Sequence, residues 1–323
     1  MLGLDYGGIK VRKLLVTGAS GFIGSNLVAR LLEEDYQVIG MDNDKKKSYL
    51  LRKVEKHPNF LMIWDDINNI DNHTAVLNGI DEVYHLAASA DIRQSYQDPT
   101  MDLKNNVQGT NAVLEYIRKA GIKRLIFSSS SSIYGVTNVT PTPEDVSDIR
   151  PISMYGASKL ANEAFIHAYN DLYGIRAWMF RFANVVGFHQ HRGVIYDLYH
   201  KLRKNKEELE VLGDGKQLKS YFDVSDCVNG LIEIPRQDHN NSVEIYNLGN
   251  NHTMSVKDLA NVLCERMKVS PLMKFTGGDR GWPGDTPYTI LSIDKALSVG
   301  WKPNYTCKQS INRTIDWLEQ SSK

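Results

Sequence analysis

The sequence predicts an α/β protein with a doubly wound parallel sheet and a smaller C-terminal domain interleaved with it. Short β-rich runs alternate with helix-length segments through the first half of the chain, and strands separated in this way form a parallel sheet with helices on both faces. A glycine-rich turn after the first run is typical of the same architecture. After Asn184 the alternation ends, so the smaller domain is expected to begin there.

Seven β-rich runs are expected to form strands. Six of them precede Asn184 and the seventh lies in the second half of the chain. They are residues 13–17, 37–41, 59–64, 82–86, 124–127, 177–181 and 243–248.

Two helices are defined by apolar periodicity and by their ends. The first follows the glycine-rich turn, and its apolar face is expected to pack on the sheet through Ile23, Leu27, Val28, Leu31 and Leu32. The second is expected over residues 154–173, with Ser153 as N-cap and Gly174 as the residue that ends it. Its apolar face is expected to contain Leu160, Ala161, Ala164, Phe165 and Ala168.

Length and charge indicate an ordinary globular protein. With 323 residues, 42% of them hydrophobic, the chain can bury a large core and divide into two lobes. Lys plus Arg and Asp plus Glu each number 38. This balance favours neither nucleic acid nor a membrane surface as a partner, so a small-molecule ligand is expected.

Cysteine spacing and the absence of long apolar runs bear on location. Cys227, Cys264 and Cys307 are far apart and form no Cys-x-x-Cys pair, which argues against a disulfide framework and a zinc site. Residues 1–10 lack the apolar core of a signal peptide, and no run approaches the roughly 18 apolar residues of a membrane span. A cytoplasmic protein with a short N-terminal extension is expected.

The glycine-rich turn has the spacing Gly18-x-x-Gly21-x-x-Gly24. Glycines at a strand–turn–helix junction let the backbone approach a pyrophosphate, which the helix N-terminus attracts. The more common spacing is Gly-x-Gly-x-x-Gly, and a glycine triplet alone is equally compatible with a plain turn. Asp42 ends the second expected strand, where a carboxylate accepts hydrogen bonds from the adenosine ribose and repels a 2′-phosphate. NAD is therefore favoured over NADP, although the lysines at 45–47 could suit a phosphate or form a solvated face.

Tyr155 and Lys159 lie one helical turn apart in the second expected helix. Ionising a phenol near pH 7 requires lowering its pKa from about 10, which takes about 4 kcal/mol. One cation at about 4 Å supplies about that much at an effective dielectric near 20. Lys159, helped by the positive nicotinamide ring, is therefore expected to make Tyr155 a base at neutral pH. The run Ser128 to Ser132 follows an expected strand, and Ser130 is our choice for the hydroxyl that holds the substrate oxygen. A polar loop beside a surface Tyr and Lys is the alternative.

Several motifs resemble those of the extended short-chain dehydrogenase/reductase family, and within it the nucleotide-sugar epimerases of the UDP-glucose 4-epimerase type. The resemblance covers residues 13–301 and rests on Thr-Gly-Ala-Ser-Gly-Phe-Ile-Gly at 17–24 and further motifs at 66–67, 86–88, 105–110, 127–135, 155–159 and 181–184. It implies a Rossmann domain over residues 11–185, to which 221–249 returns, and a nucleotide-sugar domain mainly over 186–323. It also implies a homodimer formed by the helix at 101–119 and the Tyr155 helix.

The resemblance assigns roles residue by residue. Ser130, Tyr155 and Lys159 would be catalytic. Cofactor contacts would come from Gly18, Ser20, Gly21, Phe22, Ile23, Gly24, Asp42, Asn43, Asp66, Ile67, Leu86, Ala87, Ala88, Asn106, Ser128, Tyr155, Lys159 and Ala183. Substrate contacts would come from Ser130, Ser131, Tyr155, Asn184, Val194, Lys219, Arg280, Asp285 and Thr289.

The implied reaction is reversible epimerisation at carbon 4 of a nucleoside-diphosphate hexose, with UDP-sugars favoured. Tyr155 takes the hydroxyl proton, NAD takes the hydride, and a 4-keto sugar rotates before the hydride returns, so the nucleotide must be gripped more firmly than the sugar. A one-way NAD(H)-dependent reductase or dehydrogenase of a nucleotide sugar is the main alternative. A dinucleotide-sensing regulator without catalysis is a further one.

Several positions exclude related reactions or depart from the family pattern at the expected substrate site. Related 4,6-dehydratases carry Thr-Asp-Glu where this chain has Ser130, Ser131 and Ser132, and related UDP-glucuronate decarboxylases carry Glu at 132, so both reactions are disfavoured. Lys219 stands where the family commonly has Arg, and Arg280 precedes Asp285 by five residues instead of three. A residue as small as Thr289 would leave room for an N-acetyl group on sugar carbon 2. His189 and His191 lack further ligands at metal spacing, so no metal is expected.

Overall fold

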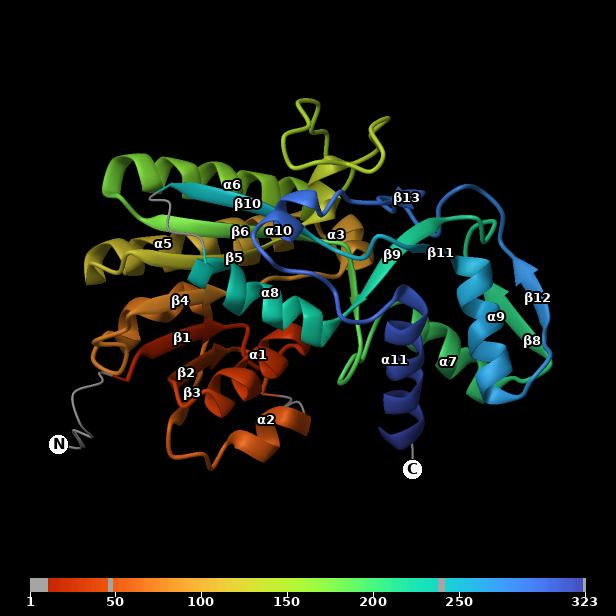
Figure 1. The fold of residues 1–323 in the computed structure, drawn as a ribbon, viewed down its shortest axis with the longest axis horizontal. Coiled ribbons are helices and arrows are strands. Elements are labelled where there is room, and N and C mark those ends of the chain that lie inside the picture. The colour runs from red at the N-terminus through yellow and green to blue at the C-terminus, as the bar shows by residue number, and fades with distance from the viewer. Residues whose placement is uncertain (1–10, 46–48, 238–241, 322–323) are drawn as a thin grey trace.

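A seven-stranded parallel sheet forms the centre of the molecule (Figure 1). The computed structural model describes residues 11–45, 49–237 and 242–321. The strand order is β10-β6-β5-β4-β1-β2-β3, and the strands are β1 (Lys13–Thr17), β2 (Gln37–Asp42), β3 (Phe60–Trp64), β4 (Glu82–His85), β5 (Arg124–Ser130), β6 (Arg176–Phe182) and β10 (Val243–Leu248). The predicted doubly wound parallel sheet is confirmed.

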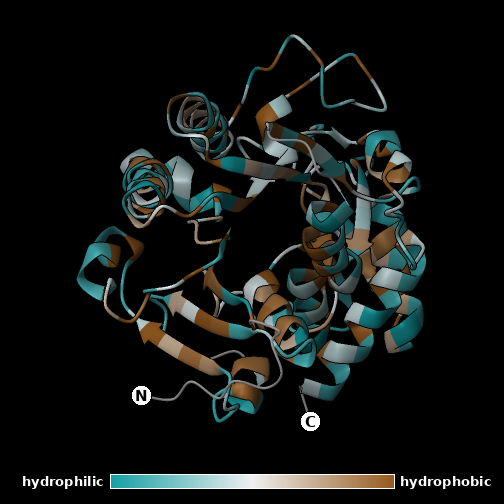
Figure 2. Ribbon diagram, turned by 60° about the vertical axis from the view of Figure 1, so that its left-hand side comes forward, coloured by the Kyte–Doolittle hydropathy of each residue, from teal (hydrophilic) through white to brown (hydrophobic). Residues whose placement is uncertain are grey.

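Helices cover both faces of this sheet. One layer contains α1 (Phe22–Glu33) and α8 (Val224–Gln237), with α2 (Tyr49–Val54) packed on α1; the other contains α5 (Gly109–Ala120), α6 (Met154–Tyr173) and the 3-10 helix η1 (Ile67–His73). Leu14 and Val16 of β1 belong to the core under α1, whereas Leu15 belongs to the core under α5. Alternation along each strand therefore fills both cores, and Figure 2 shows the resulting apolar strands between helices.

A short helical segment connects β4 to α5. It consists of α3 (Ile92–Gln97), α4 (Pro99–Asp102) and the π-helical turn η2 (Leu103–Gln108), and the 3-10 turn η3 (Ser131–Tyr134) follows β5. Single π-helical turns inside helices often occur at functional sites, and η2 carries Asn106.

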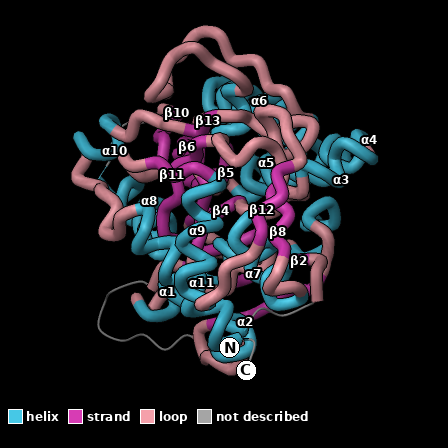
Figure 3. The backbone as a smooth tube through the Cα atoms, turned by 90° about the vertical axis from the view of Figure 1, so that its right-hand side faces the viewer, coloured by secondary structure: helices cyan, strands magenta, loops and turns pink. Residues whose placement is uncertain are grey.

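The smaller part of the molecule is built on short strands and has its own core (Figure 3). Strand β9 (Leu218–Asp223) pairs with β7 (Asn184–Val186), β11 (Thr253–Ser255) and β13 (Tyr288–Thr289), while β8 (Glu208–Val211) pairs with β12 (Leu272–Phe275). The helices here are α7 (Val194–Lys204), α9 (Val256–Met267) and α11 (Cys307–Ser321), and α10 (Asp294–Ser298) packs beside β10. Since β10 belongs to the large sheet and β9 to the small one, the chain crosses between the two parts; the proposed domain boundaries stay a prediction.

Helix α6 has the predicted ends but not the predicted buried face. Ser153 accepts a hydrogen bond from the Gly156 amide, and Gly174 ends the helix with a φ of 63°. The expected apolar face is wrong, because Ala164, Phe165 and Ala168 are exposed. The buried face is mainly polar and contains Ser158, Lys159, Asn162 and Glu163 along with Ile166. Its polar partners come from β5, β6 and η2, so apolar periodicity could not identify it.

Candidate functional site

The glycine-rich turn is too tightly packed for larger residues. Gly18 has a φ of +72°, and a Cβ added there would lie 2.7 Å from the Ala87 amide nitrogen. A Cβ on Gly24 would lie 2.0 Å from the Gly18 carbonyl oxygen. Gly21 is the N-cap of α1, so the helix begins at the carboxyl end of β1 with free amides. This geometry suits a pyrophosphate.

Asp42 lies beside this turn, as predicted. Its Oδ2 accepts the Ser20 amide at 2.9 Å and its Oδ1 accepts the Asp44 amide at 2.9 Å. Each carboxylate oxygen has further acceptor capacity, and the side chain is partly exposed. The structure therefore leaves Asp42 able to accept ribose hydroxyls. Two of the three lysines at 45–47 lie outside the described residues.

Asn43 and Asp66 meet at the ends of β2 and β3. Asn43 Nδ2 donates to Asp66 Oδ2 at 3.0 Å, and Asp66 caps η1 through the Asn68 amide. Burial opposes ionisation of Asp66, but hydrogen bonds from Asn68 and Asn43 outweigh it and lower its pKa. The Ile67 side chain is buried against α5 at Gly109, so it could offer a cofactor mainly its backbone.

The other predicted cofactor residues lie along the same edge of the sheet. Leu86, Ala87 and Ala88 follow β4 and are partly buried, as are Phe22 and Ile23 in α1. Ala183 is buried after β6, and its amide donates to the Leu248 carbonyl at 2.9 Å.

A buried histidine that sequence reasoning missed fixes the end of β4. His85 Nδ1 lies 2.7 Å from Thr17 Oγ1, and Nε2 lies 3.0 Å from Thr110 Oγ1. Burial and then Lys159 lower the His85 pKa to about 3. A neutral ring therefore joins β1, β4 and α5 under the expected cofactor site.

Three consecutive serines of β5 contact three residues of α6. Lys159 Nζ donates to the Ser128 carbonyl at 2.6 Å, and Ser129 Oγ donates to Glu163 Oε1. Ser130 lies near Tyr155, where its side chain acts on the phenol. The structure thus brings the predicted catalytic residues together. Ser128 to Ser130 form the end of the strand, which the sequence had predicted to stop at residue 127.

Burial dominates the ionisation of this trio. It raises the Tyr155 pKa to about 12, although the Ser130 side chain and the charge of Arg192 lower it. Burial also lowers the Lys159 pKa to about 7. The Lys159 ammonium lies 5.9 Å from the Tyr155 ring centroid. The expectation that Lys159 and the nicotinamide ring together make the phenol a base stays a prediction, and desolvation of the phenol adds to the shift that these two charges must supply.

Asn106 is held at the centre of a buried polar group. Its Nδ2 lies within hydrogen-bond distance of the Asp102 carboxylate, Ser158 Oγ and the Ser89 carbonyl, and its Oδ1 accepts the Ser89 amide at 2.7 Å. The turn η2 points this side chain at α6 and at the segment after β4. Asn106 therefore fixes the two segments on which a nicotinamide half would rest.

Lys219 and Asp285 form a buried ion pair on the substrate side. The Lys219 ammonium lies 2.9 Å from Asp285 Oδ1 and also bonds to Thr286. Burial lowers the Lys219 pKa, although Asp285 opposes this shift. Lys219 is thus already paired within the protein, and its expected phosphate role stays a prediction.

The remaining predicted substrate residues come from several elements. Arg280 is about 40% exposed, with Asp279 at 3.9 Å. Asn184 Nδ2 donates to the Ser220 carbonyl at 3.2 Å, and Val194 opens α7. Ser131 and Thr289 line one cavity together with Tyr134, Thr286 and neighbouring residues, so the loop after β5 faces β13 as the predicted substrate site requires.

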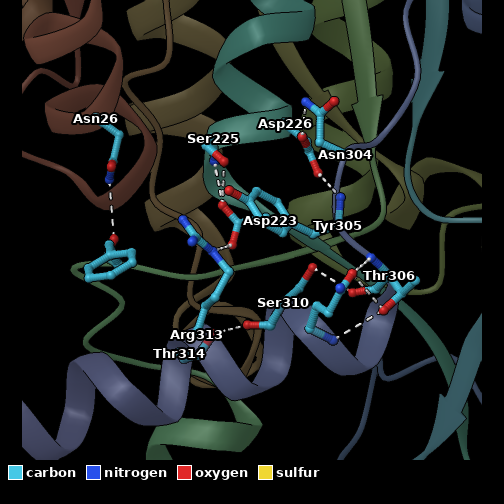
Figure 4. A network of polar contacts seen from close by, with 12 residues as sticks. Asn26, Asp223, Ser225, Asp226, Asn304, Tyr305, Thr306, Ser310, Arg313 and Thr314 are labelled. Carbon is cyan, nitrogen blue, oxygen red and sulfur yellow. Dashed lines mark hydrogen bonds and ion pairs between the residues drawn. The ribbon is translucent and has the colours of Figure 1, made fainter.

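A polar network ties the two parts of the molecule together (Figure 4). Arg313 of α11 donates to Asp223 Oδ2 at 2.8 Å, and Asp223 Oδ1 caps α8 through the Ser225 amide. Asn26 of α1 donates to the Phe188 carbonyl at 3.3 Å. The loop at 187–193, which carries Arg192, is therefore attached to the helix that follows the glycine turn.

The structure describes residues 11–45, 49–237 and 242–321. These residues contain no group of three or more His, Cys, Asp and Glu side chains arranged to hold a metal ion, and none of their helices could cross a bilayer. His189 packs on Trp317 at 4.2 Å between ring centroids, and burial lowers its pKa to about 4.

Sequence reasoning also missed Arg192, Glu163 and Asp102. Arg192 influences the Tyr155 phenol, and the two carboxylates influence Lys159. Only Glu163 had a usable signal, because it lies one helical turn after Lys159.

Comparisons with known proteins agree with this geometry. The family model described as NAD dependent epimerase/dehydratase family matches residues 14–249. A Methanocaldococcus jannaschii protein provisionally named UDP-glucose 4-epimerase is 32% identical over 96% of this chain and 99% of its own. A crystal structure of a UDP-galactose 4-epimerase has a TM-score of 0.85 at 33% identity, covering 96% of this chain and 99% of that one. A Bacillus cereus UDP-glucuronic acid 4-epimerase, solved with UDP-glucuronic acid and NAD, has a TM-score of 0.87 at 29% identity, with coverage of 96% and 99%.

Proposed function

Because the chain belongs to the NAD dependent epimerase/dehydratase family, we propose that it inverts carbon 4 of a UDP-hexose with NAD as a bound cofactor. The observation that carries this proposal is the contact of Ser130 with Tyr155, one helical turn from Lys159, at the end of β5. The glycine turn follows β1, which is parallel to β5 in the same sheet. Ligands of such sheets bind at the carboxyl ends of their strands.

The residues present suit NAD. Gly18 and Gly24 leave no room for a Cβ against the protein's own backbone, so they permit the tight turn that leads into the N-terminus of α1, where a pyrophosphate would bind. Asp42 offers ribose an acceptor and would repel a 2′-phosphate. When bound, NAD would supply the hydride acceptor and donor together with a positive charge near the phenol.

The chain's own residues then move and hold protons. Tyr155 would remove the proton from the sugar hydroxyl and return it to the same oxygen once carbon 4 has been inverted, while Ser130 holds that oxygen. Lys159 is tied to the Ser128 carbonyl, so a charged ammonium stays at a fixed place beneath the site. Any positive charge added near Tyr155 lowers its pKa from about 12 toward the working range.

The serines after β5 favour epimerisation over dehydration. Elimination of water needs a carboxyl acid and a base near the sugar, and the side chains at 131 and 132 are hydroxyls. Ser132 Oγ accepts a hydrogen bond from Ser130 at 3.1 Å, and Ser131 lines the cavity shared with Thr289. A one-way reductase or dehydrogenase of the same sugars is the second candidate, since it would use the same Ser, Tyr and Lys.

The N-acetylated pair belongs to the proposed substrates. Thr289 is a small residue whose hydroxyl lies 3.1 Å from that of Thr286, and it borders the cavity with Ser131. A homodimer and a cytoplasmic location complete the proposal. The homodimer is supported by apolar side chains exposed on α6, among them Phe165 and Leu172, and sedimentation measures it. The cytoplasmic location is supported by three free, buried cysteines.

The test is a substrate panel read by NMR. Purified protein is incubated with UDP-glucose, UDP-galactose, UDP-N-acetylgalactosamine and UDP-glucuronic acid, and the denatured protein is assayed for released NAD. The proposal predicts the carbon 4 epimer of at least one sugar without net NADH. Accumulation of NADH with a 4-keto product would support the dehydrogenase instead, and turnover of no UDP-sugar by NAD-loaded protein would refute the proposal.

A further inference from the structure

Glu163 is a buried carboxylate that the proposed reaction does not use. It is about 3% exposed and lies one turn beyond Lys159 in α6. Arg181 of β6 donates to both of its oxygens, at 3.0 and 2.7 Å, and Ser129 donates to Oε1. A carboxylate with three such donors is fixed in place.

Arg181 extends this cluster away from Lys159. Its Nη1 donates to the Tyr134 hydroxyl at 2.9 Å and to the Glu144 carbonyl at 2.8 Å. The guanidinium therefore faces the segment after β5, while Glu163 lies on the same buried face of α6 as Lys159.

Asp102 lies on a different element and is linked through Asn106 to Ser158, the residue before Lys159. It is fully buried at the end of α4, and its Oδ1 accepts from Asn106 at 2.8 Å. Both Glu163 and Asp102 act electrostatically on the Lys159 ammonium. Among the described residues, neither carboxylate forms an ion pair with it at 4.0 Å or less.

The other groups around Lys159 give it little charge compensation. Its ammonium lies 4.7 Å from the Phe127 ring centroid and donates to the neutral Ser128 carbonyl. His85 of β4 is uncharged, because its pKa is about 3, and the Tyr155 phenol is protonated below a pKa of about 12. Burial lowers the Lys159 pKa to about 7, and Glu163, followed by Asp102, opposes that change.

We propose that Glu163 and Asp102 are positioning residues that favour the protonated form of the Lys159 side chain near neutral pH. Glu163 does so from a site locked by Arg181 and Ser129, and Asp102 from the segment that carries Asn106. Without these two carboxylates, a lysine this deeply buried would be a neutral amine over much of the physiological range. The importance of this charge for turnover rests on the proposed function, whereas the charge itself does not.

Direct titration of Lys159 tests the inference without using activity. The full-length protein is labelled with lysine carrying ¹³C at the ε carbon, and Lys159→Met assigns the resonance. The variants are Glu163→Gln and Asp102→Asn, with Ser129→Ala as the matched control, because it removes a hydrogen bond to Glu163 but leaves both carboxylates.

We expect the Lys159 midpoint to move to lower pH by about one unit or more in Glu163→Gln. The unpaired Arg181 cation in that variant acts in the same direction. Asp102→Asn should give a smaller shift of the Lys159 midpoint to lower pH. In Ser129→Ala the midpoint should stay within about 0.3 pH units of the parent, which is less than the loss of one nearby charge produces. Asp102→Asn leaves no unpaired cation, so it carries the test if Glu163→Gln fails to fold.

Two results would overturn the inference. One is a parental midpoint in both carboxylate variants, and the other is an equal shift in Ser129→Ala, which would indicate a packing effect. Acidic shifts in a protein that turns over no UDP-sugar would leave this inference standing and refute the proposed function, so the two failures are distinguishable.

Discussion

Replacing Lys219 with Met separates a structural role of this residue from a role in phosphate binding. The Lys219 and Asp285 side chains are about 10% and 9% exposed, and the ammonium lies 2.9 Å from Oδ1. At an effective dielectric near 20 their attraction is about 6 kcal/mol, most of which offsets the desolvation of both charges. Removing one partner of such a pair leaves an uncompensated charge and typically costs about 3–5 kcal/mol.

We therefore expect Lys219→Met to lower the free energy of unfolding in urea by about 3–5 kcal/mol. Lys219→Met combined with Asp285→Asn should recover most of the loss, since no buried charge is then left unpaired. Lys216→Met, at an exposed position three residues away, is the control and should be neutral. If Lys219→Met keeps parental stability and only raises the KM for a UDP-sugar, Lys219 serves the phosphate and the reasoning is refuted.

Three further predictions concern pH and the cofactor turn. The folded pKa of His85, about 3, lies below its ordinary 6.5, so the unfolded chain binds more protons between these values, and stability falls as pH drops from 7 to 5. The loss is roughly 2 kcal/mol; urea unfolding at both pH values should show it in the parent but not in His85→Gln. Gly24→Ala should lose bound NAD, measured by release on denaturation, because its Cβ would lie 2.0 Å from the Gly18 carbonyl oxygen; a parental NAD content would contradict the packing argument. Arg192→Gln should raise the Tyr155 pKa and move the rising limb of the pH–rate profile to higher pH, and an unmoved limb would exclude Arg192 from the site.

The features predicted from sequence are those set by local pattern. The glycine spacing identified the turn after β1, and alternation with helix-length segments identified the strands of the large sheet. Ser153 and Gly174 marked both ends of α6 correctly. Each of these depends on residues close together in the chain.

The features that sequence missed depend on contacts between distant segments. Glu163 is buried because Ser129 and Arg181 meet it from neighbouring strands, and Lys219 is committed to a carboxylate 66 positions away. The pKa of Tyr155 depends on how much of the phenol the fold desolvates. A pattern of residue types does not contain this degree of desolvation, so the sequence argument considered the charge of Lys159 without it.

The role of Tyr155 as the acid and base at sugar carbon 4 is tested most directly by turnover of Tyr155→Phe loaded with NAD. The variant keeps the ring and removes only the hydroxyl, so bound NAD and thermal stability should match the parent. The account predicts a loss of at least about 100-fold in the rate of carbon 4 inversion followed by NMR. A rate within about threefold of the parent, far below the usual contribution of a positioned acid or base, would contradict it.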